Sequence, residues 1–370
     1  MTSHDVAMMT EALALARRAM GRTSPNPLVG AVVVADGRVV GRGFHRRAGE
    51  PHAEVLALRE AGERARGATV YVTLEPCNHA GRTGPCTEAL IAAGVRRVVA
   101  AMVDPDPQVN GKGVARLRGA GIEVDVGVLE AEARRVNEFF IKHRLTGLPF
   151  VALKWAMSLD GKTAVRRDRE TAITGEAARG YVHRLRNIYD AVLVGVGTVL
   201  ADDPQLTCRL PAGADPAPRN PLRIVVDSRL RTPLTSRVVV GIADAPTLLV
   251  TTRAAPADRI EAFRRARVEV LVQDRARGPV DLRELMEHLG RRGLLSVLVE
   301  GGGTVHASAL AAGVVDKIVA FVAPCLIGGA HAPGPLDGAA FGGFAEPLRL
   351  RQVQVERLDD DLAMTGYLEA

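Results

Sequence analysis

The stretch YVTLEPCNHAGRTGPC, residues 71–86, joins an apolar run typical of a buried strand to a loop that carries two cysteines. Upstream, residues 51–58 read PHAEVLAL, with helical spacing of apolar residues and a proline suited to a first helical turn. The predicted helix therefore carries a histidine and a glutamate, and the loop that follows the predicted strand carries a second glutamate and two cysteines. Strands separated by helices of this length form βαβ units, so the stretch favours an α/β fold.

The same alternation extends along the whole chain. The first half predicts helices at 5–20, 52–66 and 86–93, strands at 69–74 and 96–102, and a hairpin at 31–45 with a type I′ turn at Asp36-Gly37. The second half predicts strands at 151–157, 191–197, 222–228, 247–252, 268–273, 296–303 and 317–324, and an irregular loop at 211–221. Turn residues at 146–150 divide the halves, so we expect two unlike α/β domains, 1–147 and 148–370.

Length and composition agree with this division. The chain has 370 residues, 47% of them apolar and 24% charged, which indicates a globular protein with more than one core. No apolar run approaches the ~18 residues of a membrane span, and acidic residues near the N-terminus argue against a signal peptide. We therefore expect a cytoplasmic protein with no membrane partner. In a reducing compartment, Cys77 and Cys86 are a metal or catalytic pair rather than a disulfide, and Cys208 and Cys325 are packing residues.

A net charge of +6 and a pI near 9.4 raise the question of a nucleic-acid partner. The basic residues are scattered among acids, however, and the segments around the cysteines hold a single aromatic, Tyr71. Stacking of bases needs aromatic side chains. We expect no nucleic-acid partner, while a nucleic-acid deaminase stays an alternative.

His52, Cys77 and Cys86 are suited to hold zinc, because one imidazole and two thiolates leave the fourth position open for water. Glu54, two residues after His52, is the candidate catalytic residue that moves a proton to a leaving amine. The pattern H-x-E…P-C is typical of zinc deaminases, although their cysteines are usually spaced C-x-x-C. The alternative is a structural zinc site with His79 as the fourth ligand.

Longer motifs carry a closer resemblance. They are NPLVGAVVV (26–34), GEPHAEVLAL (49–58), YVTLEPCNHAGRTGPC (71–86), LIAAGVRRVV (90–99) and DPDPQVNGKG (104–113). With them the chain resembles the bifunctional deaminase–reductase family of riboflavin biosynthesis. The resemblance implies a cytidine-deaminase-like α/β/α domain followed by a dihydrofolate-reductase-like α/β domain, and the long cysteine spacing belongs to its pattern. It also implies that Asn26 and Arg82 contact substrate and that His79 faces substrate. The family usually carries Asn where Asp106 stands, so that contact is in question.

The second half resembles the family's reductase through KWAMSLDGKTA (154–164), GVGTVLADDPQLTCR (195–209) and VEGGGTVHASAL (299–310). No G-x-G-x-x-G follows its first strand, so a Rossmann site is not supported. The resemblance implies NADPH contacts at Ala156, Thr198, Asp202, Ser228, Gly302, Gly303, Thr304, Val305, His306, Ala307 and Ser308. It implies substrate contacts at Lys154, Asp160, Arg186, Leu206, Arg209 and Glu300. Arg229 and Arg231 could favour the cofactor 2′-phosphate by charge, and Asp160 and Asp202 are alternatives for proton handling.

The implied activity is zinc-dependent deamination of 2,5-diamino-6-(5-phosphoribosylamino)pyrimidin-4-one, followed by NADPH-dependent reduction of the ribosyl group to a ribityl chain. The family also implies a homo-oligomer, either a dimer or a tetramer. One segment departs from the family: Glu170 and Ala172 stand where it has Ser and Trp. Loss of an aromatic removes buried contact area. A deaminase with a weakened or non-catalytic reductase-like half is therefore a second alternative, unless Thr171 takes over the polar role.

Overall fold

The computed structural model describes residues 2–78, 84–107, 109–168, 171–211, 213–337 and 343–369. Over these residues the chain divides into two compact units, Met1–Gly147 and Leu148–Ala370, each with its own sheet. The predicted α/β fold class is confirmed for both.

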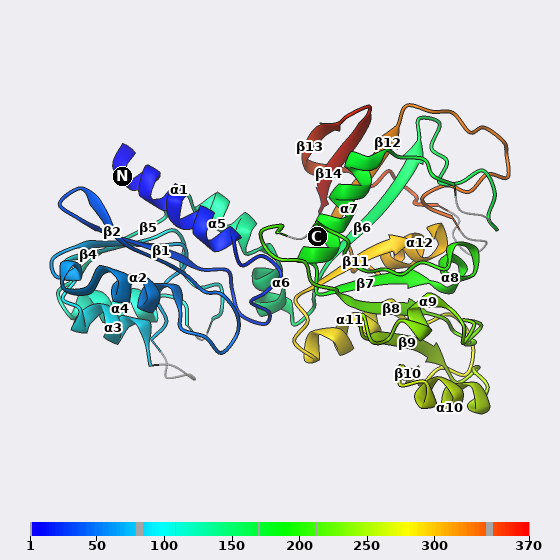
Figure 1. The fold of residues 1–370 in the computed structure, drawn as a ribbon, viewed down its shortest axis with the longest axis horizontal. Helices are drawn as coiled ribbons and strands as arrows, with labels where there is room; N and C mark the ends of the chain where they lie inside the picture. The colour runs from blue at the N-terminus through cyan, green and yellow to red at the C-terminus, as the bar shows by residue number, and fades with distance from the viewer. Residues whose placement is uncertain are drawn as a thin grey trace. The chain divides into compact units, whose positions relative to one another are not determined.

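In the described part of the N-terminal unit, five strands form one sheet in the order β2-β1-β3-β4-β5. These strands are β1 (Gly30–Ala35), β2 (Arg38–Phe44), β3 (Thr69–Val72), β4 (Arg97–Ala100) and β5 (Glu123–Val126). The pairs that involve β1 are antiparallel, and β3, β4 and β5 are parallel. The helices are α1 (Ser3–Arg17), α2 (Ala53–Ala61), α3 (Cys86–Ala92), α4 (Lys112–Gly119), α5 (Glu130–Val136) and α6 (Glu138–Thr146). Helices α1 and α5 cover one face, and α2, α3 and α4 cover the other (Figure 1).

Small residues bring α2 close to the sheet. A Cβ atom at Gly41 would lie 2.2 Å from the Ala57 carbonyl oxygen, and one at Gly43 would lie 2.2 Å from that of Ala53. Only glycine permits this approach, so strand β2 fixes the helix that carries Glu54. The hairpin turn has positive φ at both Asp36 (49°) and Gly37 (71°), which confirms the predicted type I′ geometry.

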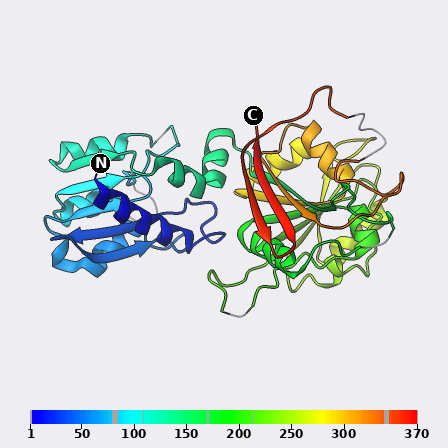
Figure 2. The same ribbon diagram turned by 90° about the horizontal axis from the view of Figure 1, so that it is seen from above.

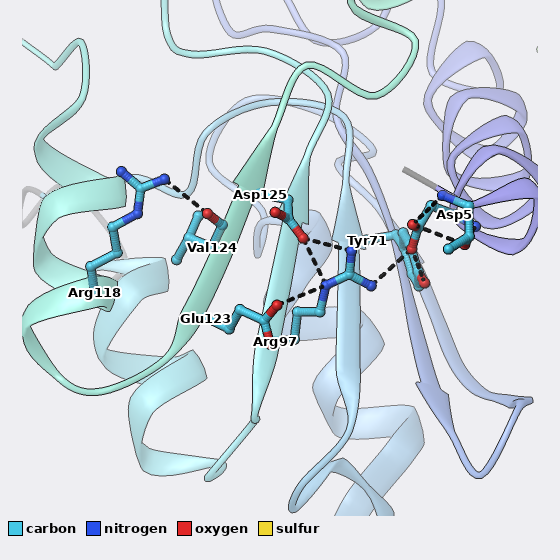
Figure 3. Close-up of polar contacts among 8 residues, drawn as sticks. Asp5, Tyr71, Arg97, Arg118, Glu123, Val124 and Asp125 are labelled. Carbon is cyan, nitrogen blue, oxygen red and sulfur yellow. Dashed lines mark hydrogen bonds and ion pairs between the residues drawn. The ribbon is translucent and has the colours of Figure 1, made fainter.

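A buried polar network ties α1 to the sheet (Figure 3). Asp5 accepts hydrogen bonds from the Tyr71 hydroxyl at 2.9 Å and from Arg97 Nη1 at 2.8 Å. Arg97 also donates twice to Asp125 Oδ2, at 2.6 and 2.8 Å. Hydrogen bonds from Arg97 hold the pKa of Asp5 well below its ordinary value. The network thus joins the first helical turn to strands β3, β4 and β5.

In the described part of the C-terminal unit, nine strands form one sheet in the order β10-β9-β8-β7-β11-β6-β12-β14-β13. They are β6 (Phe150–Ser158), β7 (Ala191–Gly195), β8 (Leu222–Val226), β9 (Thr247–Thr252), β10 (Glu269–Gln273), β11 (Ser296–Gly301), β12 (Lys317–Ala323), β13 (Leu350–Leu358) and β14 (Asp361–Leu368). The helices are α7 (Glu176–Ile188), α8 (Val196–Asp202), α9 (Arg237–Val240), α10 (Ala257–Arg265), α11 (Leu282–Arg291) and α12 (Gly303–Ala311). Strands β6 to β12 pair in parallel, and the hairpin of β13 and β14 adds to β12 in antiparallel fashion, as Figure 2 shows in red.

Two differences from the predicted elements stand out. The predicted strand at 191–197 ends at Gly195, because helix α8 begins at Val196. Strands β13 and β14 are the second difference, because the sequence pattern predicts no strand for these C-terminal residues. Within the described ranges, no helix combines the length and apolar character that a membrane crossing requires.

Candidate active sites

His52, Cys77 and Cys86 converge at one point of the N-terminal unit. His52 caps α2, Cys77 lies in the loop after β3, and Cys86 opens α3. Their ligand atoms all lie within 4.8 Å of one another. His52 Nδ1 is 3.2 Å from Cys86 Sγ and 3.5 Å from Cys77 Sγ. Tetrahedral zinc with its usual bond lengths sets nitrogen and sulfur about 3.5 Å apart, so this donor set fits zinc.

Glu54 lies beside these donors with its side chain 3% exposed. Among the described residues, its Oε2 atom is buried and has no hydrogen-bond partner. Burial raises the pKa of Glu54 above its ordinary value. A buried carboxyl oxygen without a partner is costly unless a ligand or water meets it. Glu54 therefore has the position and the environment of a proton-transfer group.

The Glu75 carboxylate holds the loop that borders the site. Among the described contacts it accepts four backbone N–H groups, from Asp104 and Gly111 on Oε2 and from Gly113 and Val114 on Oε1, at 2.8–3.0 Å. The last two amides open helix α4, whose orphan donors a carboxylate satisfies well. Glu75 thereby fixes the segment between β4 and α4 against the strand end that leads to Cys77.

A cavity of about 410 Å³ opens beside the cysteines. Asn26, His52, Glu54 and Cys77, all predicted from sequence, contribute to its wall. Lining residues that sequence reasoning missed include His45, Asp104, Phe140 and Arg144. His45 Nε2 lies 3.1 Å from Asn26 Nδ2, and burial lowers the pKa of His45. No local spacing signals these residues, because β2, the loop after β4, and α6 meet only in the folded unit.

Three predicted substrate residues cluster in the C-terminal unit. Arg186 on α7 donates to both oxygens of Glu300 on β11, at 2.6 and 2.7 Å. Lys154 Nζ on β6 is 3.9 Å from Glu300 Oε2. Burial opposes ionisation of Glu300, but the Arg186 guanidinium outweighs it and holds the pKa below the ordinary value. Burial lowers the pKa of Lys154.

The remaining predicted substrate residues behave differently. The Arg209 backbone N–H donates to His183 Nδ1 at 3.3 Å, and its side chain is exposed. Leu206 is 2% exposed and its side chain packs in the core, so its contact with substrate stays a prediction. Asp160 accepts hydrogen bonds from Ser158 Oγ and from the amides of Ile327 and Gly328. These bonds lower its pKa to about 2 and give it a loop-holding role.

Several predicted cofactor residues meet at the start of α12. Gly302 caps this helix, and its N–H donates to Thr198 Oγ1 of α8 at 3.3 Å. Gly302 and Thr304 are exposed, and among the described residues a Cβ at Gly302 would meet only Thr198 Oγ1, at 3.6 Å. An exposed helix N-terminus with a glycine cap fits a pyrophosphate group. Close packing requires a glycine at position 303, because a Cβ there would lie 2.8 Å from the Gly334 carbonyl oxygen and 2.7 Å from Asp337 Cβ.

Other residues of that predicted set are less accessible. His306 and Ala307 are buried, and His306 Nδ1 lies 2.9 Å from the Pro335 carbonyl oxygen. Ser228 Oγ accepts a hydrogen bond from the Val280 N–H. Ala156, Asp202, Val305 and Ser308 are half-buried, and Arg229 and Arg231 are exposed. Their contacts with a cofactor stay predictions.

Three residues named in the sequence analysis lie outside the described residues. They are His79 and Arg82, in the loop between the cysteines, and Glu170, in the segment that departs from the family. Thr171 Oγ1 accepts the Val165 N–H at 3.1 Å, and Ala172 is exposed. Thr171 therefore holds its own loop.

Comparisons with known proteins match each half of the chain to a known domain family. Residues 2–102 match the cytidine and deoxycytidylate deaminase zinc-binding region, and residues 149–364 match the RibD C-terminal domain. The riboflavin biosynthesis protein RibD of Aquifex aeolicus is 44% identical over 360 residues, with 97% of each chain covered. The Acinetobacter baumannii RibD structure superposes with a TM-score of 0.88 at 40% identity and 99% coverage of both chains. A Thermotoga maritima structure, described as a diaminohydroxyphosphoribosylaminopyrimidine deaminase and 5-amino-6-(5-phosphoribosylamino)uracil reductase, gives 0.85 at 37% identity and 99% coverage of both chains. With a deaminase zinc site in one half and the RibD reductase domain in the other, the chain belongs to the RibD family of bifunctional riboflavin-biosynthesis enzymes.

Proposed function

We propose that residues 1–147 deaminate 2,5-diamino-6-(5-phosphoribosylamino)pyrimidin-4-one and that residues 148–370 reduce the ribosyl group of the product with NADPH. The observation that carries the first step is the buried Glu54 carboxyl beside three convergent zinc ligands. The Thermotoga maritima relative is described with these two activities, which supports the same pair of substrates here.

In the deaminase site, His52, Cys77 and Cys86 would hold zinc. Zinc supplies Lewis acidity and lets water act as a nucleophile near neutral pH. Glu54 Oε2 accepts the proton of the attacking water and delivers it to the departing amine, so a ring C–NH₂ and water become C=O and ammonia. The raised pKa of Glu54 suits both directions of transfer.

Glu54→Gln tests this step. Glutamine keeps the size of the side chain but cannot carry the proton, so we expect loss of ammonia release by a factor of about 10²–10⁴ with zinc retained. Glu60→Gln is the matched control, because Glu60 is exposed on the same helix. Normal ammonia release by Glu54→Gln would refute the assignment.

In the reductase site, NADPH supplies the hydride and the protein orients the two reactants. The N-terminus of α12, with Gly302 and Thr198, would bind the pyrophosphate of the cofactor. Glu300 is held as a carboxylate by Arg186, which suits it to accept hydrogen bonds from substrate hydroxyls. Because Arg186 is committed to Glu300, the exposed Arg209 is the better candidate for a substrate phosphate in this half.

NADPH oxidation with the deaminated substrate separates this proposal from a deaminase with an inactive reductase-like half. We expect mass analysis to find loss of one amine without NADPH, and amine loss plus two hydrogens with NADPH. Amine loss alone under both conditions would favour the inactive half.

We further propose that the chain acts as a cytoplasmic homo-oligomer. Val353 and Val355 on β13 and Leu362 and Met364 on β14 are all exposed, at the edge of the sheet. Exposed apolar residues on an edge strand commonly mark a contact between chains. Light scattering is expected to give a dimer or tetramer that Val355→Lys dissociates. A wild-type monomer would contradict this proposal.

A further inference from the structure

Acidic residues are frequent in the wall of the deaminase cavity. Four of its lining residues are carboxylic acids, namely Glu54, Glu75, Asp104 and Asp106. The proposed substrate carries a phosphate with about −1.5 to −2 charges near neutral pH. A cationic side chain in the wall would therefore favour binding of that group.

Arg144 is such a side chain among the described lining residues. It lies on α6 and lines the cavity with its side chain 41% exposed. The other basic groups in the wall are histidines: burial lowers the pKa of His45, and His52 faces the two thiols. A guanidinium stays charged at any physiological pH and matches phosphate oxygens with two parallel donors.

The surroundings of Arg144 hold its guanidinium in place and leave donors available. Arg144 Nη1 is 3.8 Å from Asp106 Oδ2, beyond hydrogen-bond distance. Its Cζ atom lies 5.2 Å from the centre of the Phe140 ring, within cation–π range. The Asp106 carboxylate and the Phe140 ring thus position the guanidinium at the cavity while its N–H groups can reach a ligand.

We propose that Arg144 binds the 5′-phosphate of the deaminase substrate and that Asp106 orients Arg144 for this contact. The inference rests on the proposed function and identifies the residue that binds the phosphate of the substrate. It also accounts for Asp106, where the family usually has Asn. A carboxylate at that position repels a phosphate unless it is paired, and Arg144 provides the pairing.

Because Arg144 and Asp106 interact, the effect on the KM of a substitution at one position should depend on the residue at the other. Without Arg144, the Asp106 carboxylate stands uncompensated against the phosphate, so Asp106→Asn should recover part of the loss caused by Arg144→Met. A double-mutant cycle measures this coupling. With Arg144 present, Asp106→Asn should change the KM little, since it removes both a repulsion and an orienting contact.

The test uses the full-length zinc-loaded enzyme without NADPH, so that ammonia release reports the deaminase alone. Its substrates are the phosphorylated pyrimidine and the same compound without the 5′-phosphate. We expect Arg144→Met to raise the KM for the phosphorylated substrate about 10- to 100-fold, the scale of a charge-assisted hydrogen bond. Neither its kcat nor the KM for the dephosphorylated compound should change by more than about threefold, because the lost contact is to the phosphate.

Arg134→Met is the matched control, since Arg134 lies on neighbouring helix α5 and pairs with Glu130 at the surface. A readout other than activity is calorimetric titration of the phosphorylated substrate into Glu54→Gln, with and without Arg144→Met. We expect Arg144→Met to raise the Kd of one binding event by the same factor of about 10 to 100.

Equal losses for both substrates would overturn the proposal, because Arg144 would then act only on the structure. An unchanged KM for both would also overturn it, and a selective effect of Arg82→Met would then locate the phosphate at the loop between the cysteines. Absence of ammonia release by the wild-type enzyme would refute the proposed function instead, so the two failures are distinguishable.

Discussion

Glu75→Gln should release the segment that borders the zinc site. The carboxylate accepts four backbone N–H groups, two on each oxygen, and its side chain is 3% exposed. Glutamine replaces one oxygen by an NH₂ group, so two of the four donors face another donor. A buried unsatisfied donor costs about 1–3 kcal/mol, and the two bonds that remain lose their charge. We therefore expect destabilisation of this segment by about 3–5 kcal/mol.

Hydrogen exchange measured by mass spectrometry is the direct assay, because the affected groups are amides. Peptides that contain Asp104, Gly111, Gly113 and Val114 should exchange at least about 100-fold faster in the variant, at 1.4 kcal/mol per factor of ten. Peptides from β8 in the other unit should exchange as in the wild type.

The matched control is Glu88→Gln. Glu88 also accepts two charged hydrogen bonds, from Arg116, but its side chain is 49% exposed. Exposed ion pairs contribute about 0–1 kcal/mol, so exchange should change less than about fivefold. Wild-type protection of the Asp104–Val114 segment in Glu75→Gln would refute the reasoning that the carboxylate holds these amides.

Three further outcomes follow from the sites and the buried network. Asp5→Asn should lower the free energy of unfolding by about 2–4 kcal/mol, because Arg97 loses a buried charged partner. Since the pKa of Asp5 is depressed, this stabilisation is full above about pH 4 and declines below it, so the gap between wild-type and variant melting temperatures should narrow in acid. A strong zinc chelator should abolish ammonia release but spare NADPH oxidation with the deaminated substrate; loss of both would contradict separate sites. Ala172→Trp should lower the KM for NADPH about tenfold by adding apolar cover, and an unchanged KM would show that position 172 does not meet the cofactor.

The zinc donors were predictable because each follows from a local rule. His52 and Glu54 share the first turn of one helix, and Cys77 follows a strand end. His45 and Arg144 reach the same cavity from β2 and α6 through packing that no spacing encodes. The end of strand β7 was missed for a related reason, since AVLVGVG is apolar throughout and its period does not separate a buried strand from the helix that follows.

The C-terminal hairpin shows a different limit. Strand β14 buries Asp361 and Ala363 and exposes Leu362 and Met364, so these two large apolar side chains lie on the outer face. A strand assigned by burial of its apolar face would receive the opposite register. This pattern supports the proposed contact between chains, because such a contact would cover the outer face.

Three buried glutamates show why residue type alone does not assign a role. Within the described residues, Glu54 Oε2 has no hydrogen-bond partner, the Glu75 carboxylate holds four amides, and Glu300 is clamped by Arg186. A carboxyl that must gain and lose a proton needs an oxygen that no other group occupies, and burial raises the pKa of Glu54, whose Oε2 meets this condition. Full occupation by amides makes Glu75 a structural anchor. Ion pairing keeps Glu300 a carboxylate, which suits it to accept the hydrogen bonds proposed from substrate hydroxyls rather than to donate a proton.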